Sequence, residues 1–218
     1  MVGVSGGTFT FADVLAPIYG VLLGPYAGAI SVTLGTFLAI ALGRPMIFLG
    51  LDFLPAAVNA LSVGLLLRGR WLVSVGLYLG LFFLFLIHPY SAIFVPVSIP
   101  SVSLNSFFFF PWMHFIALLV LISPLSRKAA AWVNGTSFVN LAPGIMTLVF
   151  IGTFAQHLMG ALLYETILGM FVGKAPEVFR LFWSAVFWLY PFERSFIIVL
   201  ATIIGVPLVK ALRPAGLL

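Results

Sequence analysis

Apolar residues run along this chain in long, nearly continuous stretches that are separated by short polar or proline-containing breaks. Such runs are typical of membrane-spanning helices, because about 20 apolar residues are needed to cross the hydrocarbon core. Continuous apolarity also favours helices over a β-barrel, whose strands would alternate apolar and polar positions. The breaks predict seven helices, with approximate bounds Phe9–Gly24, Tyr26–Gly43, Met46–Leu67, Trp71–Ile87, Phe107–Leu125, Pro143–Phe171 and Pro191–Leu212.

Three other stretches do not have the pattern of a spanning helix. Residues 90–105 contain prolines and four serines, and their alternating Val, Ile and Phe predict a short extended cap. Residues 129–141 and 181–190 are expected to lie at the membrane interface. If residues 9–43 form one bent span, the chain has six spans in place of seven.

Composition supports the membrane assignment. The chain is 63% hydrophobic and 7% charged, whereas a soluble domain carries about 25% charged residues. We therefore expect an all-α, polytopic integral membrane protein of six to seven transmembrane helices, with one transmembrane domain over residues 1–218. It would lie in the cell membrane as a multi-pass protein.

Several kinds of chemistry lack their sequence signals. The chain has no cysteine, which excludes thiolate metal sites and cysteine nucleophiles. No phosphate-binding glycine loop, HExxH or GxSxG pattern occurs, and the histidines are too scattered to indicate a metal site. We expect no enzyme activity, no cofactor and no metal. The net charge of +5 is better explained by membrane orientation than by nucleic-acid binding.

Basic residues occur in pairs at alternate ends of the predicted helices. The pairs are Arg68/Arg70, Arg127/Lys128 and Lys210/Arg213, whereas Arg44, Lys174, Arg180 and Arg194 fall at the opposite ends. Because cytoplasmic loops are enriched in Lys and Arg, we expect the paired ends, and with them the C-terminus, in the cytoplasm. The N-terminus then lies outside with seven spans and inside with six.

Polar residues at membrane depth are costly and often mark functional sites. In the predicted orientation they gather toward the external half, where they would line a cavity for a small molecule. The candidate ligand-binding residues are Asp52, Asn59, Trp112, His114, His157, Tyr164, Glu165 and Arg194. Asp52 and Asn59 are seven residues apart, as are His157 and Tyr164, so each pair shares a helix face.

Each candidate also has a structural interpretation. Arg194 and its neighbour Glu193 follow Pro191, where an acidic first turn would complement the helix dipole. Glu165 and His157 place a carboxylate and an imidazole within one span, which makes them the strongest functional candidates. An internal structural pair would explain them equally well.

Small residues recur at every fourth position near the N-terminus. Ala12, Ala16, Gly20, Gly24 and Gly28 would form one stripe on a helix, along which a second backbone can approach closely. Pro25 disfavours helical geometry at Gly24, which predicts two helices meeting at a tight turn. The stripe either docks a partner subunit or packs within the chain.

Two motifs resemble a known transporter family. The stretch LGPYAGAISVTLG at residues 23–35 resembles the G-P-x-x-G-A turn of substrate-binding S components of energy-coupling-factor vitamin transporters. The stretch at residues 203–212 is similar to the last helix of such components. The resemblance implies a vitamin-like ligand in an outward cavity, docking through the small-residue stripe, and separate transmembrane coupling and ATPase subunits.

The sequence is also compatible with two other classes of function. A membrane scaffold or assembly subunit would use the small-residue stripe to hold a partner and would need no cavity. An integral membrane enzyme acting on lipid would use Glu165 and His157 as acid and base.

The orientation is testable with single cysteines, because the chain has none of its own. We expect Arg68→Cys, Arg127→Cys and Lys210→Cys to be protected from a membrane-impermeant maleimide in intact cells. All three should react once the membrane is permeabilised, since the positive-inside rule places them in the cytoplasm. Labelling of all three cysteines in intact cells would show that the orientation is the opposite of the predicted one.

Overall fold

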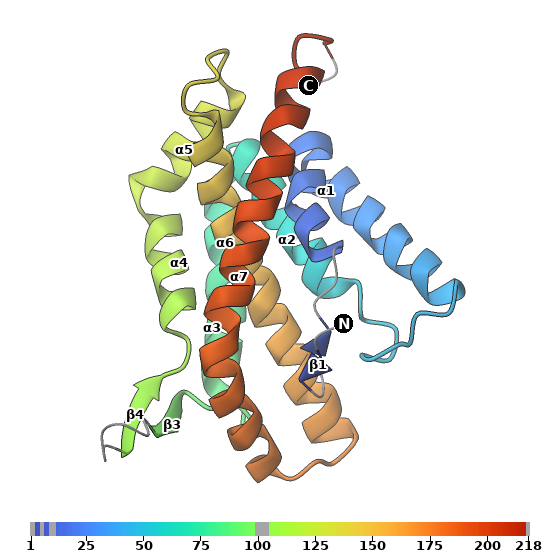
Figure 1. The fold of residues 1–218 in the computed structure, drawn as a ribbon, viewed down its shortest axis with the longest axis vertical. Coiled ribbons are helices and arrows are strands. Elements are labelled where there is room, and N and C mark those ends of the chain that lie inside the picture. Colours follow the sequence, from blue (N-terminus) through green and yellow to red (C-terminus); the bar gives the residue numbers. More distant parts are fainter. Residues whose placement is uncertain (1–2, 5–6, 9–11, 99–104, 217–218) are drawn as a thin grey trace.

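The structure, a computed structural model, is built almost entirely of helices (Figure 1). It describes residues 3–4, 7–8, 12–98 and 105–216. The helices are α1 (Ala12–Ala41), α2 (Leu54–Leu67), α3 (Trp71–Ile87), α4 (Trp112–Ile122), α5 (Pro124–Asn134), α6 (Leu141–Tyr164) with the π-helical segment η1 (Glu165–Phe171), and α7 (Pro176–Leu212). Two short antiparallel hairpins, β1–β2 (Gly3–Val4, Gly7–Thr8) and β3–β4 (Phe94–Ser98, Asn105–Phe109), complete the fold.

Helix α1 is broken at Gly24, as the Gly-Pro sequence predicted. Gly24 has φ 78° and ψ −175°, a conformation that is essentially restricted to glycine. The second half then folds back against the first, since a Cβ on Gly28 would lie 2.8 Å from the carbonyl oxygen of Tyr19. Figure 1 shows the two halves as an inverted V, with the second half splayed away from the bundle.

Helix α2 packs against both halves of α1 at very short range. A Cβ on Gly20 would lie 2.4 Å from the carbonyl oxygen of Ala60, and one on Gly64 would lie 2.3 Å from the nitrogen of Pro25. Ala16 is fully buried beside Ala60. Glycine and alanine are required here because their small side chains let the two backbones touch.

The small-residue stripe is therefore mostly covered within the chain. Ala16, Gly20 and Gly28 are buried, whereas Ala12 is exposed and Gly24 is half-buried. The three buried positions pack against other parts of the same chain. This is the second of the two interpretations that the sequence left open, the first being docking of a partner subunit. Docking of a partner along this stripe stays a prediction for the accessible positions only.

Helix α6 forms the centre of the bundle and contacts each of the other α-helices. Leu148, Ile151, Phe154 and Ala155 are all fully buried, and successive residues around the whole helix are covered. A helix that is apolar on every side is expected at the core of a helical membrane protein. Its central place is what brings polar residues of α6 into contact with several other helices.

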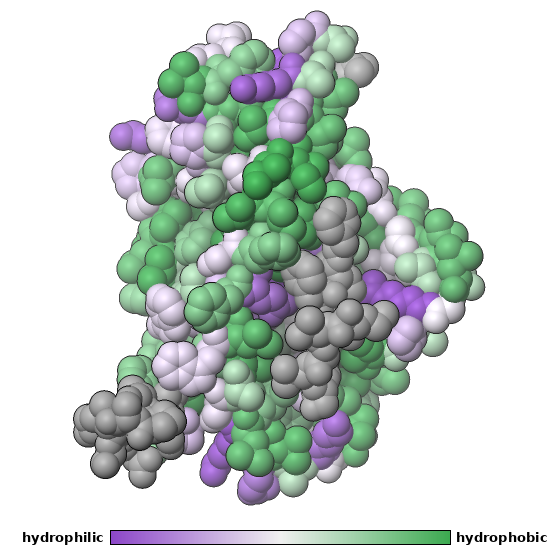
Figure 2. Space-filling view, viewed as in Figure 1, coloured by the Kyte–Doolittle hydropathy of each residue, from purple (hydrophilic) through white to green (hydrophobic). Residues whose placement is uncertain are grey.

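The outer surface is apolar along the helices. On the splayed half of α1, Ile30, Leu34 and Leu38 are 59–64% exposed. Figure 2 shows hydrophobic residues over the long sides of the molecule and strongly hydrophilic residues mainly at its two ends and beside the splayed half of α1. This distribution suits a protein surrounded by lipid.

By length and composition alone, three of the described helices are long and apolar enough to cross a membrane, namely α1, α7 and α6 with η1. Because α1 is broken at Gly24, its 30 residues do not form one straight span. The pair α4 and α5, bent by 68°, makes a fourth if it counts as one broken span. A nearly all-α membrane protein is thus supported, but six to seven spans are not confirmed. Helices α2 and α3 are shorter than a usual span.

Several predicted bounds are confirmed. Helix α3 matches the predicted residues 71–87, and α6 with η1 matches the predicted residues 143–171 to within two residues. The predicted extended cap is the β3–β4 hairpin, of which residues 99–104 lie outside the described residues. Phe9, Thr10 and Phe11, where the first helix was predicted to begin, also lie outside them.

Three predicted helices differ from the observed ones. Helix α2 begins at Leu54 and not at Met46, because the preceding residues form a loop with positive φ at Leu49 and Gly50. Helix α4 begins at Trp112, since the residues before it pair in β4. Helix α7 continues from Pro176 through Pro191, whose ring removes one backbone hydrogen bond without ending the helix.

The α1–α2 contact yields a stability prediction. Gly64→Ala should lower the free energy of unfolding by about 1–3 kcal/mol, because the new methyl group overlaps the backbone of Pro25. The matched control is Gly76→Ala in the middle of α3, where a Cβ meets no atom within 4 Å. Thermal unfolding in detergent measures both variants, and equal midpoints would contradict the close approach.

Candidate ligand-binding site

A cavity of about 310 Å³ lies between both halves of α1, the loop before α2, and helices α2, α6 and α7. It lies at the ends of α1 and α2 that are remote from the Gly24 break. Its wall combines small and apolar residues with nine polar or charged side chains: Asp13, Tyr19, Ser31, Thr36, Arg44, Asp52, Gln156, His157 and Arg194. Volumes of about 300–1,000 Å³ are typical of small-molecule sites.

The splayed half of α1 closes one side of this cavity with small residues. Ser31, Gly35, Thr36 and Ala39 line it, and they recur at helical spacing on one face. The hydroxyl group of Thr36 donates to the carbonyl oxygen of Val32 in its own helix at 3.0 Å. Because these side chains are small, the space between this half of α1 and the rest of the bundle stays open.

A buried chain of polar groups joins three helices at the cavity wall. Asn59 of α2 donates its Nδ2 to Gln156 Oε1 of α6 at 2.7 Å. Gln156 in turn donates its Nε2 to Asp13 Oδ1 of α1 at 2.6 Å. Asn59 fits only because α6 has glycine at position 152, where a Cβ would lie 2.2 Å from Asn59 Oδ1. This chain fixes the amide of Gln156 and the carboxylate of Asp13 at the wall.

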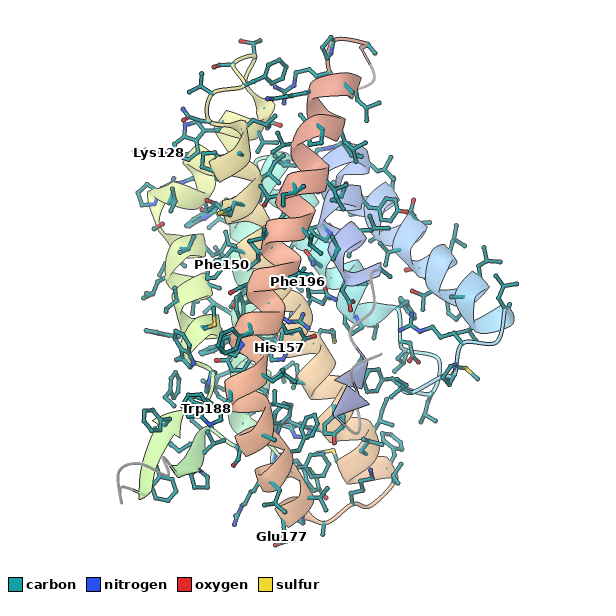
Figure 3. All side chains as sticks on the ribbon, viewed as in Figure 1. Lys128, Phe150, His157, Glu177, Trp188 and Phe196 are labelled. Atoms are coloured by element: carbon teal, nitrogen blue, oxygen red, sulfur yellow. The ribbon has the colours of Figure 1, made fainter. Side chains whose placement is uncertain are left out.

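Two histidines and a tyrosine stack beside that chain. His114 Nε2 lies 2.7 Å from His157 Nδ1, and the two rings are stacked with centroids 4.9 Å apart. Tyr190 stacks on His157 with ring centroids 5.3 Å apart and also lies 5.6 Å from the His114 ring, so the three rings form one cluster. Because a hydrogen bond between two imidazoles needs one N–H and one lone pair, one ring of the pair must be neutral. Figure 3 shows His157 at mid-height of the bundle, between Phe150 and Trp188.

Arg194 brings a positive charge to the same wall. It is 7% exposed, and its Nη2 donates to Glu193 Oε1 at 2.7 Å. Its Nε has no hydrogen-bond partner in the described part of the chain. Arg194 lines the cavity, so its guanidinium places a positive charge and N–H donors at the wall, where an acceptor group of a ligand would be favoured. The sequence interpretation of Glu193 as an acidic first turn is wrong, because α7 begins at Pro176 and Glu193 lies within it.

Asp52 lies in the loop before α2, and not at the end of a longer helix as predicted. Its carboxylate oxygens accept from the backbone N–H groups of Ile47 at 2.9 Å and Phe48 at 3.0 Å. These bonds hold the loop, which also carries Arg44, over the cavity. Asp52 thus has a structural role, and its carboxylate contributes negative charge to the cavity wall.

Glu165 belongs to a different cluster. Its side chain is fully buried at the start of η1, where Oε2 accepts from Ser91 Oγ at 2.7 Å and lies 3.2 Å from His88 Nδ1. Burial lowers the pKa of His88, and its Nδ1 also accepts from the backbone N–H of Tyr90 at 3.3 Å. None of these residues lines the cavity.

The predicted site residues thus separate into several groups. Asp52, His157 and Arg194 line the cavity, and Asn59 and His114 support it from behind through Gln156 and His157. Tyr164 stacks on Phe182 at 4.4 Å near the Glu165 cluster. Trp112, at the start of α4, is 38% exposed and does not line the cavity.

Sequence reasoning missed Asp13, Arg44 and Gln156. Asp13 is the one acidic residue within the first predicted helix, and Gln156 directly precedes His157, so both carried a signal that was not used. Arg44 was used only in the orientation argument, as a basic residue at the end opposite the basic pairs. Among the residues that the structure describes, no group of three or more His, Asp or Glu side chains is arranged to hold a metal ion.

The polar chain gives a second prediction. Gln156→Leu should cost about 1–3 kcal/mol of stability, because it leaves the Asn59 amide without a partner in the interior. Thr36→Val is a matched control at the same cavity, since the Thr36 hydroxyl bonds only its own helix backbone. Thermal unfolding of both variants compares them. An unchanged midpoint for Gln156→Leu would show that the polar chain does not stabilise the fold.

Comparisons of the chain with protein-family models, with curated proteins and with solved structures find no match. Any functional assignment therefore depends on the residues of the cavity and on their arrangement among apolar helices.

Proposed function

We propose that this chain is the membrane-embedded binding component of an uptake system for a small polar molecule. The observation that carries the proposal is the cavity of about 310 Å³, whose wall holds charges of both signs among helices that are otherwise apolar. Charged groups at membrane depth are costly and are typically found where they face water, a partner or a ligand. A scaffold subunit would need no such cavity.

The chemistry of the wall indicates the kind of ligand. Arg44 and Arg194 provide positive charge, Asp13 and Asp52 provide negative charge, and Gln156 is fixed in orientation by its two hydrogen bonds. A ligand with both donor and acceptor groups would match this wall. The volume is near the lower limit of about 300 Å³ for small-molecule sites, so the ligand is small, in the range of a vitamin or similar micronutrient.

Transport would require other subunits. The sequence has no phosphate-binding glycine loop, so nucleotide hydrolysis would come from separate ATPases. The resemblance of the Gly24–Pro25 turn to that of energy-coupling-factor S components supports a transmembrane coupling subunit as the intermediary. The acid–base pair of a lipid enzyme finds no support, since Glu165 and His157 belong to separate clusters.

Arg194 provides the test of the cavity. Protein purified gently from its native membrane should carry a small molecule that mass spectrometry identifies after extraction. Arg194→Gln should reduce the affinity for that molecule by about 1.5–3 kcal/mol, because a charge-assisted hydrogen bond is lost. Arg180→Gln is the matched control, since Arg180 lies on the same helix, is exposed and does not line the cavity.

Glu165→Gln is a second control, because Glu165 does not line the cavity. It should change thermal stability with or without ligand and leave the affinity intact. Equal ligand content in wild-type, Arg194→Gln and Arg180→Gln protein would contradict binding in this cavity, as would wild-type protein that carries no small molecule at all.

A further inference from the structure

Basic side chains are concentrated at one end of the molecule. Six of the ten Lys and Arg residues lie there, namely Arg68, Arg70, Arg127, Lys128, Lys210 and Arg213. The ends of α2, α5 and α7 meet in this region, since Asn134 Nδ2 donates to the Leu67 carbonyl oxygen at 2.8 Å and Arg213 donates to the Val133 and Gly135 carbonyl oxygens. Figures 1 and 3 show α5, the C-terminal end of α7 and Lys128 together at this end.

No Asp or Glu side chain of the chain lies at this basic end. The chain has five acidic residues, all of which the structure describes. Asp13 and Asp52 line the ligand cavity, Glu193 pairs with Arg194, Glu165 bonds Ser91, and Glu177 lies at the opposite end of α7 (Figure 3). The six cations therefore create an uncompensated positive field where the apolar helices end.

A second cavity opens within this end. It has a volume of about 380 Å³ and lies between α1, α2, α5 and α7. Arg68, Asn134 and Arg213 supply its polar side chains, and Gly20, Gly24 and Gly64 form part of its wall. At Gly20 and Gly64 the missing side chains are needed for the close α1–α2 contact, so the polar side chains supply the binding chemistry of this cavity.

Arg68 is the cation with free donors in this cavity. Its guanidinium has no hydrogen-bond or ion-pair partner among the described residues, and it lies over the α1 break, where a Cβ on Gly24 would be 3.0 Å from Arg68 Nη2. The second half of α1 begins at the same point, and a helix start carries partial positive charge. Arg213, by contrast, is engaged by the α5 carbonyl oxygens.

We propose that this second cavity binds the phosphate headgroup of an anionic phospholipid. A planar guanidinium with unused N–H donors matches two phosphate oxygens, and basic pockets between membrane helices are suited to lipid headgroups. Leu23, which is 44% exposed, lines the cavity and leads to the apolar sides of the bundle, where acyl chains would lie. The proposal does not depend on the ligand cavity at the other ends of α1 and α2.

The test uses delipidated full-length protein in an uncharged detergent, with phosphatidylglycerol and phosphatidylcholine as probes. Native mass spectrometry measures the affinity of each lipid. We expect phosphatidylglycerol to bind at least about tenfold more tightly than phosphatidylcholine, and Arg68→Gln to remove about tenfold to a hundredfold of that affinity. Lys128→Gln is the matched control, because it removes one charge at the same end without lining the cavity.

Each outcome decides the proposal. Preference for phosphatidylglycerol that Arg68→Gln removes and Lys128→Gln keeps would support it. Equal binding of the two lipids would overturn the proposal, and an acidic protein segment would then be the better candidate for the basic end. Equal losses of affinity in Arg68→Gln and Lys128→Gln would also overturn it, because they would indicate a diffuse effect of charge. Displacement of the lipid by inorganic phosphate at matched concentration would assign the cavity to a free anion. If Arg68→Gln is unstable without lipid, Arg68→Lys serves in its place, with a smaller loss of affinity expected.

Discussion

The close approach of α1 and α2 is the constraint on which the rest of this structure depends. At Gly20 and Gly64 the two backbones leave no room for a single methyl group. Lipid provides no hydrophobic force that would press helices together, so contact between backbones must supply the packing energy. This contact is possible only because small residues recur on α1 at the spacing of one helical turn.

The break at Gly24 makes both cavities possible. Both halves of α1 contact α2 near the break, and the second half then diverges and leaves space between its inner face and helices α2 and α6. The point of the break itself contributes glycine to the wall of the second cavity.

Much of the fold was predictable from the sequence because it depends on local patterns. Continuous apolarity identified the helices, and the Gly-Pro pair identified the break in α1. The loop before α2 was not predicted, since it depends on Asp52 accepting two backbone N–H groups from residues that are themselves apolar. Gly50 and Pro55 are the sequence signals for that loop and for the start of α2, and they were not used because the surrounding residues are continuously apolar.

The candidate site was harder to predict because its contacts link distant segments. Asp13 and Gln156 are separated by 143 positions, and His114 and His157 by 43. Helical spacing alone also gave the wrong place for Glu165, which was predicted to line the cavity together with His157. Eight residues from His157 correspond to two turns and a further rotation of about 80°, which directs Glu165 toward Ser91 and away from the ligand cavity.

The short helices around the ligand cavity have a consequence for the electric field across the membrane. The two halves of α1 and the 14-residue α2 are each about 18–26 Å long at 1.5 Å per residue, which is less than the hydrocarbon thickness of about 30 Å. A water-filled cavity at the ends of these helices would lie within the bilayer. The membrane potential would then fall mainly across the part of the hydrocarbon layer that the cavity does not reach. A charged molecule entering it would cross part of that potential, and crossing the whole is worth about 2.3 kcal/mol per charge at 100 mV. The resting potential would then favour or oppose occupancy according to the sign of the ligand's charge.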